Sequence, residues 1–318
     1  MYITLMAALR KAKSVAVIGY GPQGRAIAQN LRDSGYEVAV GLRAGSSSRA
    51  RARRDGLSVS GIPAAVRRSD VVCFAFPDHL HGRVFRRSIA PQLRRKATLW
   101  FLHGTSVHFG FLQPPKGCDV ILVAPHAPGE AVRAAYVADR SLSAFYGVYQ
   151  NRSGHASRAA GQLAAAIGVR KKNLVKTSFA REAVGDLFGE QAVLCGGLAM
   201  LIKTGFEILL ERGWRPENAY LEVAYQLDLI VALIKKHGLA GMFTRISPAA
   251  QFGSLTAGPK IIDRSARARM EQVFADVQSG SFADKLNSMS DKKLAGLRKA
   301  LNALTNPSLE RAARKFSR

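Results

Sequence analysis

Residues 14–43 have the sequence SVAVIGYGPQGRAIAQNLRDSGYEVAVGLR, in which a strand, a glycine-rich turn, a helix and a second strand follow one another. The first strand ends at Ile18, and Gly19, Gly21 and Gly24 after it have the spacing GxGxxG. Glycines at these positions allow a tight turn, a close approach of backbone to pyrophosphate and close helix–strand packing. The N–H groups at the start of the helix then bind phosphate. The stretch predicts a dinucleotide site, with a purely structural glycine turn as the alternative.

The loop after the second strand indicates which dinucleotide is bound. A chain that binds NAD usually carries Asp or Glu there for the ribose hydroxyls, whereas this loop is GLRAGSSSR. Arg43, Ser46 and Ser48, with Arg49 as a further candidate, offer a cation and hydroxyls to a 2′-phosphate. The loop therefore favours NADPH, and an ordinary basic loop is the alternative.

Further strands follow at intervals through the first half of the chain, at 70–77, 97–104, 119–129, 144–150 and 173–179. Helical segments between some of them predict an α/β fold, a Rossmann-type, doubly wound parallel sheet covered on both faces. Ligands collect at the carboxyl ends of the strands in such a sheet. Those ends carry Asp78 and His81, then His103, then His126.

Long helical patterns replace the strands from about Arg181 onward. We therefore predict a nucleotide-binding domain at 1–179 and an all-helical domain at 180–318. The last segment, DKKLAGLRKALNALTNPSLERAARKFSR, predicts a basic amphipathic helix, a turn at Asn306–Pro307 and a frayed tail.

Three carboxylates share one face of the first long helix. Glu182, Asp186 and Glu190 are four residues apart, so they are neighbours on the helix surface. Clustered carboxylates repel one another unless a cation neutralises them, and oxygen ligands suit Mg²⁺. Glu222 and Gln226 repeat the spacing on a second helix. The pattern predicts a Mg²⁺ site, and a solvated acidic stripe is the alternative.

The overall composition limits the class of protein. The chain has 318 residues, of which 47% are hydrophobic and 22% charged, and this predicts two folded domains. We find no run of the roughly 18 apolar residues that a membrane helix needs. The start, MYITLMAALRKAK, has its charges after its apolar residues, the reverse of a secretory signal, so we expect a cytoplasmic protein.

The charge balance raises nucleic acid as a partner. Lys and Arg total 47 and Asp and Glu total 22, which gives a net charge of +25. The basic residues are scattered, and we find no aromatic-interleaved RNA motif or zinc finger among them. A solvated, arginine-rich surface is the favoured interpretation, and affinity for a polyanion is the alternative.

Several longer stretches resemble ketol-acid reductoisomerases of the short, class I form, in the family's order and over essentially the whole chain. They are VAVIGYGPQG, LRDSGYEVAVGLR, HFGFLQPP, DVILVAP, DLFGEQAVLCGG, LIKTGFE and GLAGM. The resemblance implies an enzyme of branched-chain amino-acid biosynthesis that uses NADPH and Mg²⁺ on 2-acetolactate or 2-aceto-2-hydroxybutyrate. An alkyl group migrates first, and hydride then reduces the 2-keto acid to a dihydroxy acid. It also implies at least a homodimer, because neither subunit completes the site alone.

The resemblance implies roles for individual residues. The cofactor contacts are Gly19, Tyr20, Gly21, Pro22, Gln23, Gly24, Arg43, Ser46, Ser48, Asp78, His81 and Gly129. The catalytic candidates are His103, Ser247 (which holds the substrate), His126 and Glu182. The metal candidates are Asp186 and Glu190 of one subunit with Glu222 and Gln226 of the second helix, where Glu222 matches a ligand supplied by the partner.

The chain departs from the family pattern at three polar positions. His126 replaces a lysine that lies by the metals, and Gln226 replaces a glutamate. An amide ligates Mg²⁺ without adding negative charge, and a neutral imidazole removes a fixed positive charge. His81 stands where the family usually has Gln. These changes bear on the alkyl migration more than on cofactor binding, because migration depends on strong positive charge at the reacting oxygens.

Three hypotheses follow for the activity. The chain is a working reductoisomerase, a paralogue that only reduces a 2-keto acid or related carbonyl or imine, or a non-catalytic relative that binds NADPH. The retained carboxylates Glu182, Asp186, Glu190 and Glu222 argue against the third, since a binding module does not need them.

Overall fold

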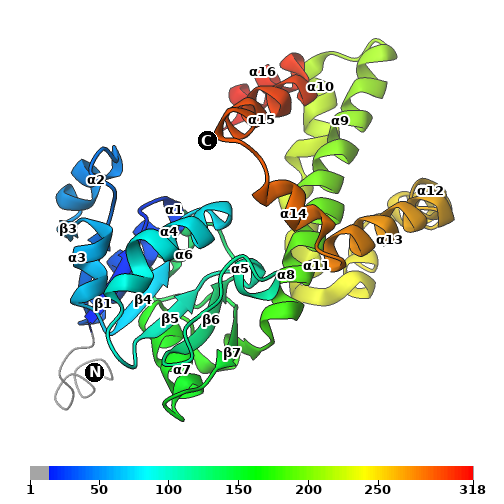
Figure 1. Cartoon of the computed structure of the whole chain (residues 1–318). Helices are drawn as coiled ribbons and strands as arrows, with labels where there is room; N and C mark the ends of the chain where they lie inside the picture. Colours follow the sequence, from blue (N-terminus) through cyan, green and yellow to red (C-terminus); the bar gives the residue numbers. More distant parts are fainter. Residues whose placement is uncertain (1–13, 318) are drawn as a thin grey trace. The chain divides into compact units, whose positions relative to one another are not determined.

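The computed structural model describes residues 14–317, so the predictions made for MYITLMAALRKAK lie outside the described residues. The chain divides into two compact units, Met1–Gly185 and Asp186–Arg318. The division falls inside helix α8 (Phe179–Gly189), whereas the predicted boundary lies at the start of that helix. Figure 1 shows strands confined to the first unit and helices throughout the second.

The first unit is built on one eight-stranded sheet with the order β3-β2-β1-β4-β5-β6-β7-β8. The strands are β1 (Ser14–Ile18), β2 (Glu37–Gly41), β3 (Ser58–Ser60), β4 (Val71–Phe74), β5 (Thr98–Phe101), β6 (Asp119–Pro125), β7 (Ala144–Gln150) and β8 (Leu174–Lys176). The helices are α1 (Pro22–Asp33), α2 (Ser48–Arg54), α3 (Ile62–Arg67), α4 (His81–Val84), α5 (Thr105–His108), α6 (Gly129–Val137), α7 (Ala156–Ala166) and α8. The predicted α/β fold with a doubly wound sheet is confirmed.

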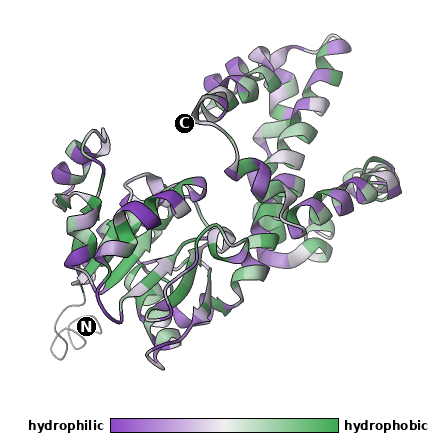
Figure 2. Cartoon of the chain, in the orientation of Figure 1, coloured by the Kyte–Doolittle hydropathy of each residue, from purple (hydrophilic) through white to green (hydrophobic). Residues whose placement is uncertain are grey.

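Alternate residues of the central strands enter two different cores, as the period of two in a strand requires. Val15 and Val17 of β1 pack with Ile27 and Leu31 of α1 and with α7. Ala16 and Ile18 pack on the other face with α3 and α5. All four β1 residues are fully or almost fully buried, which explains the continuous apolar run of this parallel strand. Figure 2 shows the strands as hydrophobic ribbon between more polar helices.

One pair of strands departs from the predicted parallel arrangement. β7 pairs with β6 in the antiparallel direction, while every other pair in the sheet is parallel. Ala144 at the start of β7 lies opposite Pro125 at the end of β6. β7 therefore begins beside the carboxyl end of β6 and runs in the opposite direction.

The second unit is helical. Its helices are α9 (Gly196–Glu211), α10 (Pro216–Tyr220), α11 (Leu227–Phe243), α12 (Pro248–Ile261), α13 (Arg264–Gln278), α14 (Ser281–Asn287), α15 (Asp291–Leu304) and α16 (Pro307–Phe316). The predicted frayed tail is wrong, because α16 is a regular helix after the turn. Asn306 caps it through the Ser308 N–H, and Phe316 stacks on Tyr220 of α10 with ring centroids 5.9 Å apart.

The long helical run Phe179–Glu211 is apolar enough and long enough to cross a membrane by length and composition alone, with a mean hydropathy of 1.8. The expectation that no stretch reaches this length is therefore wrong, because a few polar residues interrupt the run without breaking the helix. Only 6% of the apolar window is buried. A face of this helix is thus left uncovered by the described residues.

Candidate active site

Three glycines pack the glycine-rich turn against its neighbours. Gly19 has φ +100°, and a Cβ there would collide with the Ala75 carbonyl after β4. A Cβ on Gly24 would lie 2.7 Å from the Gly19 oxygen, and one on Gly129 would collide with the Pro22 backbone. Side chains at these positions would therefore displace the turn. Gly129 at the start of α6 therefore packs closely on this turn, a long-range contact that the motif spacing does not predict.

The start of α1 suits an anion. The helix has no acidic residue in its first turn and no side chain of the described residues capping its first N–H groups. Its amides and its dipole are thus available to a phosphate. Gln23 donates from Nε2 to the Ala127 carbonyl at 2.7 Å, while its Oε1 is buried with no hydrogen-bond partner among the described groups. The N–H groups and dipole of α1 fit the pyrophosphate of a dinucleotide, while the Gln23 side chain ties the turn to Ala127.

Tyr20, from the same turn, has a side chain that is only 3% exposed. Its hydroxyl donates to Asp55 Oδ2 at 2.8 Å, and the Arg25 guanidinium donates to both Asp55 oxygens at 2.8 and 3.2 Å. Burial, followed by the hydrogen bond to Asp55, raises the pKa of Tyr20. The Arg25 hydrogen bond holds the pKa of Asp55 below its usual value. Asp55 thereby ties the glycine-rich turn to the end of α2.

The loop between β2 and α2 contains the candidate 2′-phosphate ligands. Arg43 is exposed, and Ser46 and Ser48 are half-buried and adjacent, since the Ser48 N–H donates to Ser46 Oγ at 3.4 Å. Arg49 is folded back, and its guanidinium donates to the Leu42 carbonyl at 3.0 Å. Arg43 is therefore the cation of this loop that remains available to a phosphate.

A buried carboxylate lies beside the histidine that follows β5. Glu182 of α8 is 4% exposed and accepts the Gly104 N–H at 2.6 Å. Its Oε2 is 3.1 Å from His103 Nδ1, and Thr105 Oγ1 is 2.9 Å from the same nitrogen. The carboxylate and hydroxyl orient the His103 ring, whose side chain remains 20% exposed. An imidazole held in this way is oriented to serve as a general acid or base.

The end of β4 brings Asp78 and His81 near this cluster. His81 is 2% exposed and uses both ring nitrogens within the protein, on the Phe76 carbonyl and on Ser106. Ser106 Oγ is also 3.5 Å from Asp78 Oδ1. Burial lowers the pKa of His81. The candidate cofactor contact His81 is thus an internal side chain, a placement that sequence position alone did not indicate.

Two other catalytic candidates are exposed in one chain. His126, after β6, stacks edge-on against Phe145 with ring centroids 4.3 Å apart. Ser247 caps α12 by accepting the Ala250 N–H at 3.2 Å. Both side chains remain accessible to a ligand.

Two of the metal candidates, Glu190 and Glu222, lie in the π-helical turns Glu190–Leu194 and Leu221–Tyr225, and Gln226 follows the second turn. Asp186 is half-buried, and Glu190 and Glu222 are exposed. Gln226 is exposed too, and its Nε2 donates to the Leu221 carbonyl at 3.2 Å. Such turns occur often at functional sites, and the spacing of carboxylates did not predict them. Among the described residues, no group of three or more His, Cys, Asp or Glu side chains could hold a metal ion.

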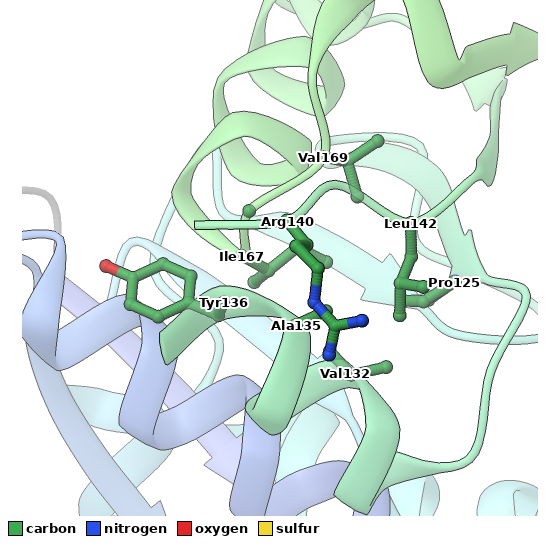
Figure 3. Close-up of a pocket in the computed structure, with 9 residues that line it drawn as sticks. Pro125, Val132, Ala135, Tyr136, Arg140, Leu142, Ile167 and Val169 are labelled. Atoms are coloured by element: carbon green, nitrogen blue, oxygen red, sulfur yellow. The ribbon is translucent and has the colours of Figure 1, made fainter. Parts of the chain in front are cut away.

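Two hollows in the surface are separate from these side chains. The one in Figure 3, lined among others by Tyr136, Arg140 and Ile167, has a volume of about 10 Å³, too small for more than one water. An open hollow of about 630 Å³ in the second unit lies between the end of α11 and α12, and Leu255 and Ile262 line it.

Comparison with known families accounts for both units. Residues 9–173 match the acetohydroxy acid isomeroreductase NADPH-binding domain, and residues 179–317 match the ketol-acid reductoisomerase C-terminal domain. The chain belongs to the ketol-acid reductoisomerase family. The resemblance seen in the sequence is thereby confirmed across both units.

Individual relatives agree with this assignment. A ketol-acid reductoisomerase (NADP(+)) of Pyrobaculum aerophilum is 46% identical over 298 residues, which cover 93% of this chain and 91% of the relative. One of Xanthomonas campestris pv. campestris (strain B100) is 45% identical over 269 residues, covering 85% and 81%. A solved NADH-preferring ketol-acid reductoisomerase from an uncultured archean matches with a TM-score of 0.91 at 35% identity, covering 96% and 95%.

Proposed function

We propose that this chain is an NADPH- and Mg²⁺-dependent ketol-acid reductoisomerase. It converts 2-acetolactate or 2-aceto-2-hydroxybutyrate to the 2,3-dihydroxy acid in the biosynthesis of branched-chain amino acids. The observation that carries the proposal is the buried Glu182–His103 pair at the end of β5, in a chain that matches both family domains. The enzyme acts in the cytoplasm on a small-molecule substrate, with neither membrane nor nucleic acid as its partner.

NADPH lies across the carboxyl ends of β1, β2 and β4. The α1 N-terminus receives the pyrophosphate, and Arg43, Ser46 and Ser48 receive the 2′-phosphate. The exposed guanidinium of Arg43 supports this choice, because a charge-assisted bond to phosphate favours NADPH over NADH. One relative is named NADH-preferring, whereas the curated relatives are named for NADP(+), so cofactor preference within the family varies.

Mg²⁺ is held by Asp186 and Glu190 of one subunit together with Glu222 of the partner subunit, and Gln226 is the neighbouring amide. Carboxylate and amide oxygens suit this ion. The support is the exposure of the Glu190 and Glu222 carboxylates, which leaves both accessible to an ion. When bound, Mg²⁺ supplies positive charge at the reacting oxygens of the substrate.

The protein groups supply orientation and proton transfer. Ser247 donates a hydrogen bond to the substrate, and His126 adds a polar group at the end of β6. Glu182 and Thr105 hold the His103 ring, which exchanges a proton with the substrate as the alkyl group moves and as the carbonyl is reduced.

A homodimer is part of this proposal. The exposed apolar side chains of the second unit include Leu201 at 53%, Phe252 at 70% and Leu255 at 75% exposure. We infer that a second copy covers these exposed apolar side chains, because large apolar surfaces left open to water mark interaction sites. A second copy that covers this surface would also bring the partner subunit's Glu222 to the metal ligands.

A reductase that has lost the alkyl migration is the second candidate. It is favoured by His126 and by Gln226, whose amide already donates to Leu221 within its own chain. His126 removes a fixed positive charge and Gln226 is a weaker metal ligand than glutamate, so both changes act on the migration step, while the His103–Glu182 pair is intact.

The deciding experiment follows NADPH oxidation with 2-acetolactate and, in parallel, with 3-hydroxy-3-methyl-2-oxobutanoate, each with and without Mg²⁺. The second compound is the product of migration, so it isolates the reduction. Turnover of both supports a reductoisomerase, and turnover of the second alone supports the reductase. Binding of NADPH without turnover of either compound would reject both.

A further inference from the structure

The buried imidazole of His81 is fixed by ring packing and by a hydrogen bond at each of its two nitrogens, which a contact with the cofactor does not require. The ring packs edge-on against Phe74 and Phe76, with centroids 5.3 and 4.5 Å away. Its Nε2 is 2.8 Å from the Phe76 carbonyl, and its Nδ1 is 2.8 Å from Ser106 Oγ. Because a carbonyl only accepts hydrogen bonds, Nε2 must carry the proton.

The rest of the hydrogen bonding then follows. In a neutral ring with its proton on Nε2, Nδ1 accepts, so the Ser106 hydroxyl must donate to it. The burial of both side chains excludes water from this bond, since Ser106 is fully buried and His81 is 2% exposed. Asp78 Oδ1, at 3.6 Å from Nδ1, is beyond hydrogen-bond distance. The ring therefore has one defined tautomer and one defined orientation.

Ser106 connects this ring to the proposed reacting histidine. It belongs to α5, which begins at Thr105 directly after the His103–Gly104 turn. Thr105 Oγ1 lies 2.9 Å from His103 Nδ1, on one side of the ring, and Glu182 Oε2 lies 3.1 Å from the same nitrogen. A shift of α5 would move the Thr105 hydroxyl and change how the His103 ring is held. The hydrogen bond from Ser106 to His81 anchors α5 to the end of β4.

We propose that His81 is a positioning residue, which joins the ends of β4 and β5 through Ser106 and so fixes His103 for catalysis. The inference deepens the proposed function, on which the role of His103 rests. It replaces a direct contact of the His81 side chain with the cofactor.

Glutamine provides a conservative test. Its amide has an NH₂ donor group and an oxygen acceptor at nearly the separation of the two imidazole nitrogens, so it can donate to Phe76 and accept from Ser106. Leucine fills the same space and makes neither bond. Ser106→Ala removes the donor to Nδ1 together with the longer contact to Asp78, and it keeps the test open if His81→Leu fails to fold.

The experiment compares His81→Gln, His81→Leu and Ser106→Ala with the exposed-site control His155→Leu. For each variant, kcat is measured on the already migrated 2-keto acid, the Kd for NADPH by fluorescence and the midpoint of thermal unfolding. We expect Ser106→Ala and His81→Leu to lower kcat by about tenfold to a hundredfold with little change in Kd, the effect of a displacement of about 1 Å. His81→Gln should recover most of the kcat that His81→Leu loses.

Other results would overturn the proposal. A rise in the Kd for NADPH in His81→Gln and His81→Leu alike would make His81 a cofactor contact. A lower unfolding midpoint with unchanged kcat per folded molecule would make it structural only. A tautomer measurement by ¹⁵N NMR needs no turnover, so it separates this proposal from the proposed function. A proton on Nδ1 at neutral pH would reject the proposal even if the enzyme is active.

Discussion

The two units differ in how many of their polar and apolar side chains find partners within one chain. In the first unit several of the chemically important side chains are internal and paired, as Tyr20 with Asp55 and Glu182 with Gly104 show. In the second unit Glu190, Glu222 and Ser247 are exposed, and so is a wide apolar surface. Fully burying one large apolar side chain contributes about 1.5–3 kcal/mol, so this surface favours a partner. The first unit therefore pairs more of its polar side chains within one chain, and the proposed function assigns to a second copy the completion of the exposed groups in the second unit.

The largest expected effect separates the two units directly. Leu201→Glu, on α9 at 53% exposure, should yield monomers and lower Mg²⁺-dependent turnover by at least about a hundredfold, because an unpaired carboxylate in an apolar interface costs several kcal/mol. The Kd for NADPH should not change. Sedimentation measures the assembly state, NADPH oxidation measures the turnover, and fluorescence titration measures the Kd for NADPH.

The control for that substitution is Val137→Glu, on α6 of the first unit at 69% exposure. It adds the same charge to an equally open apolar position and should leave assembly and turnover as they are. If Leu201→Glu stays dimeric and active, the exposed surface of α9 is not the interface.

Glu182→Gln tests whether the first unit depends on charge or only on shape. The amide oxygen still accepts the Gly104 N–H, but the negative charge beside His103 is lost. We expect kcat to fall by about a hundredfold, within the usual contribution of general acid–base catalysis, with an unchanged Kd for NADPH. The exposed Glu37→Gln is the matched control. Equal kcat in both variants would show that the negative charge of Glu182 does not contribute to catalysis.

The features that the sequence predicted are local ones. The glycine-rich turn, the strands around it and the basic loop at Arg43 are each specified by neighbours in the chain, so pattern and spacing were sufficient. Helix α16 could also have been found, since Asn306 followed by Pro307 is a typical helix start.

The remaining features depend on residues far apart in the sequence. Tyr20 meets Asp55 and His81 meets Ser106 only after the strands are paired. The π-helical turns at Glu190–Leu194 and Leu221–Tyr225 each insert a wide turn into a run whose hydrophobic pattern is that of an ordinary helix. No local pattern distinguishes them, because the packing of neighbouring helices decides where the extra residue lies.

A smaller effect tests the cofactor loop. Arg43→Ala should lower the preference for NADPH over NADH by about tenfold or somewhat more, since hydrogen bonds to charged groups contribute about 1.5–3 kcal/mol. Arg49→Ala should weaken both cofactors alike, because its guanidinium holds the Leu42 carbonyl. Arg53→Ala, exposed on α2, is the control. The test is the Kd of each variant for NADPH and for NADH. If the ratio of the two Kd values changes in Arg49→Ala alone, Arg49 binds the 2′-phosphate and Arg43 does not.

The smallest effect concerns acid stability. Burial lowers the pKa of His81 in the folded protein, with His103 and His79 adding to the decrease and Asp78 opposing it. Above the ordinary value of about 6.5 the ring is neutral in both states and protonation costs nothing. As the pH falls below that value, the unfolded chain binds the proton first, and stability decreases by at most about 1.4 kcal/mol per pH unit until the folded ring is also protonated. His81→Gln removes this titration, so its unfolding midpoint should fall less than that of the parent chain on acidification from neutral pH. Equal decreases in the two proteins would mean that folding does not lower the pKa of His81, which contradicts the effect of its burial.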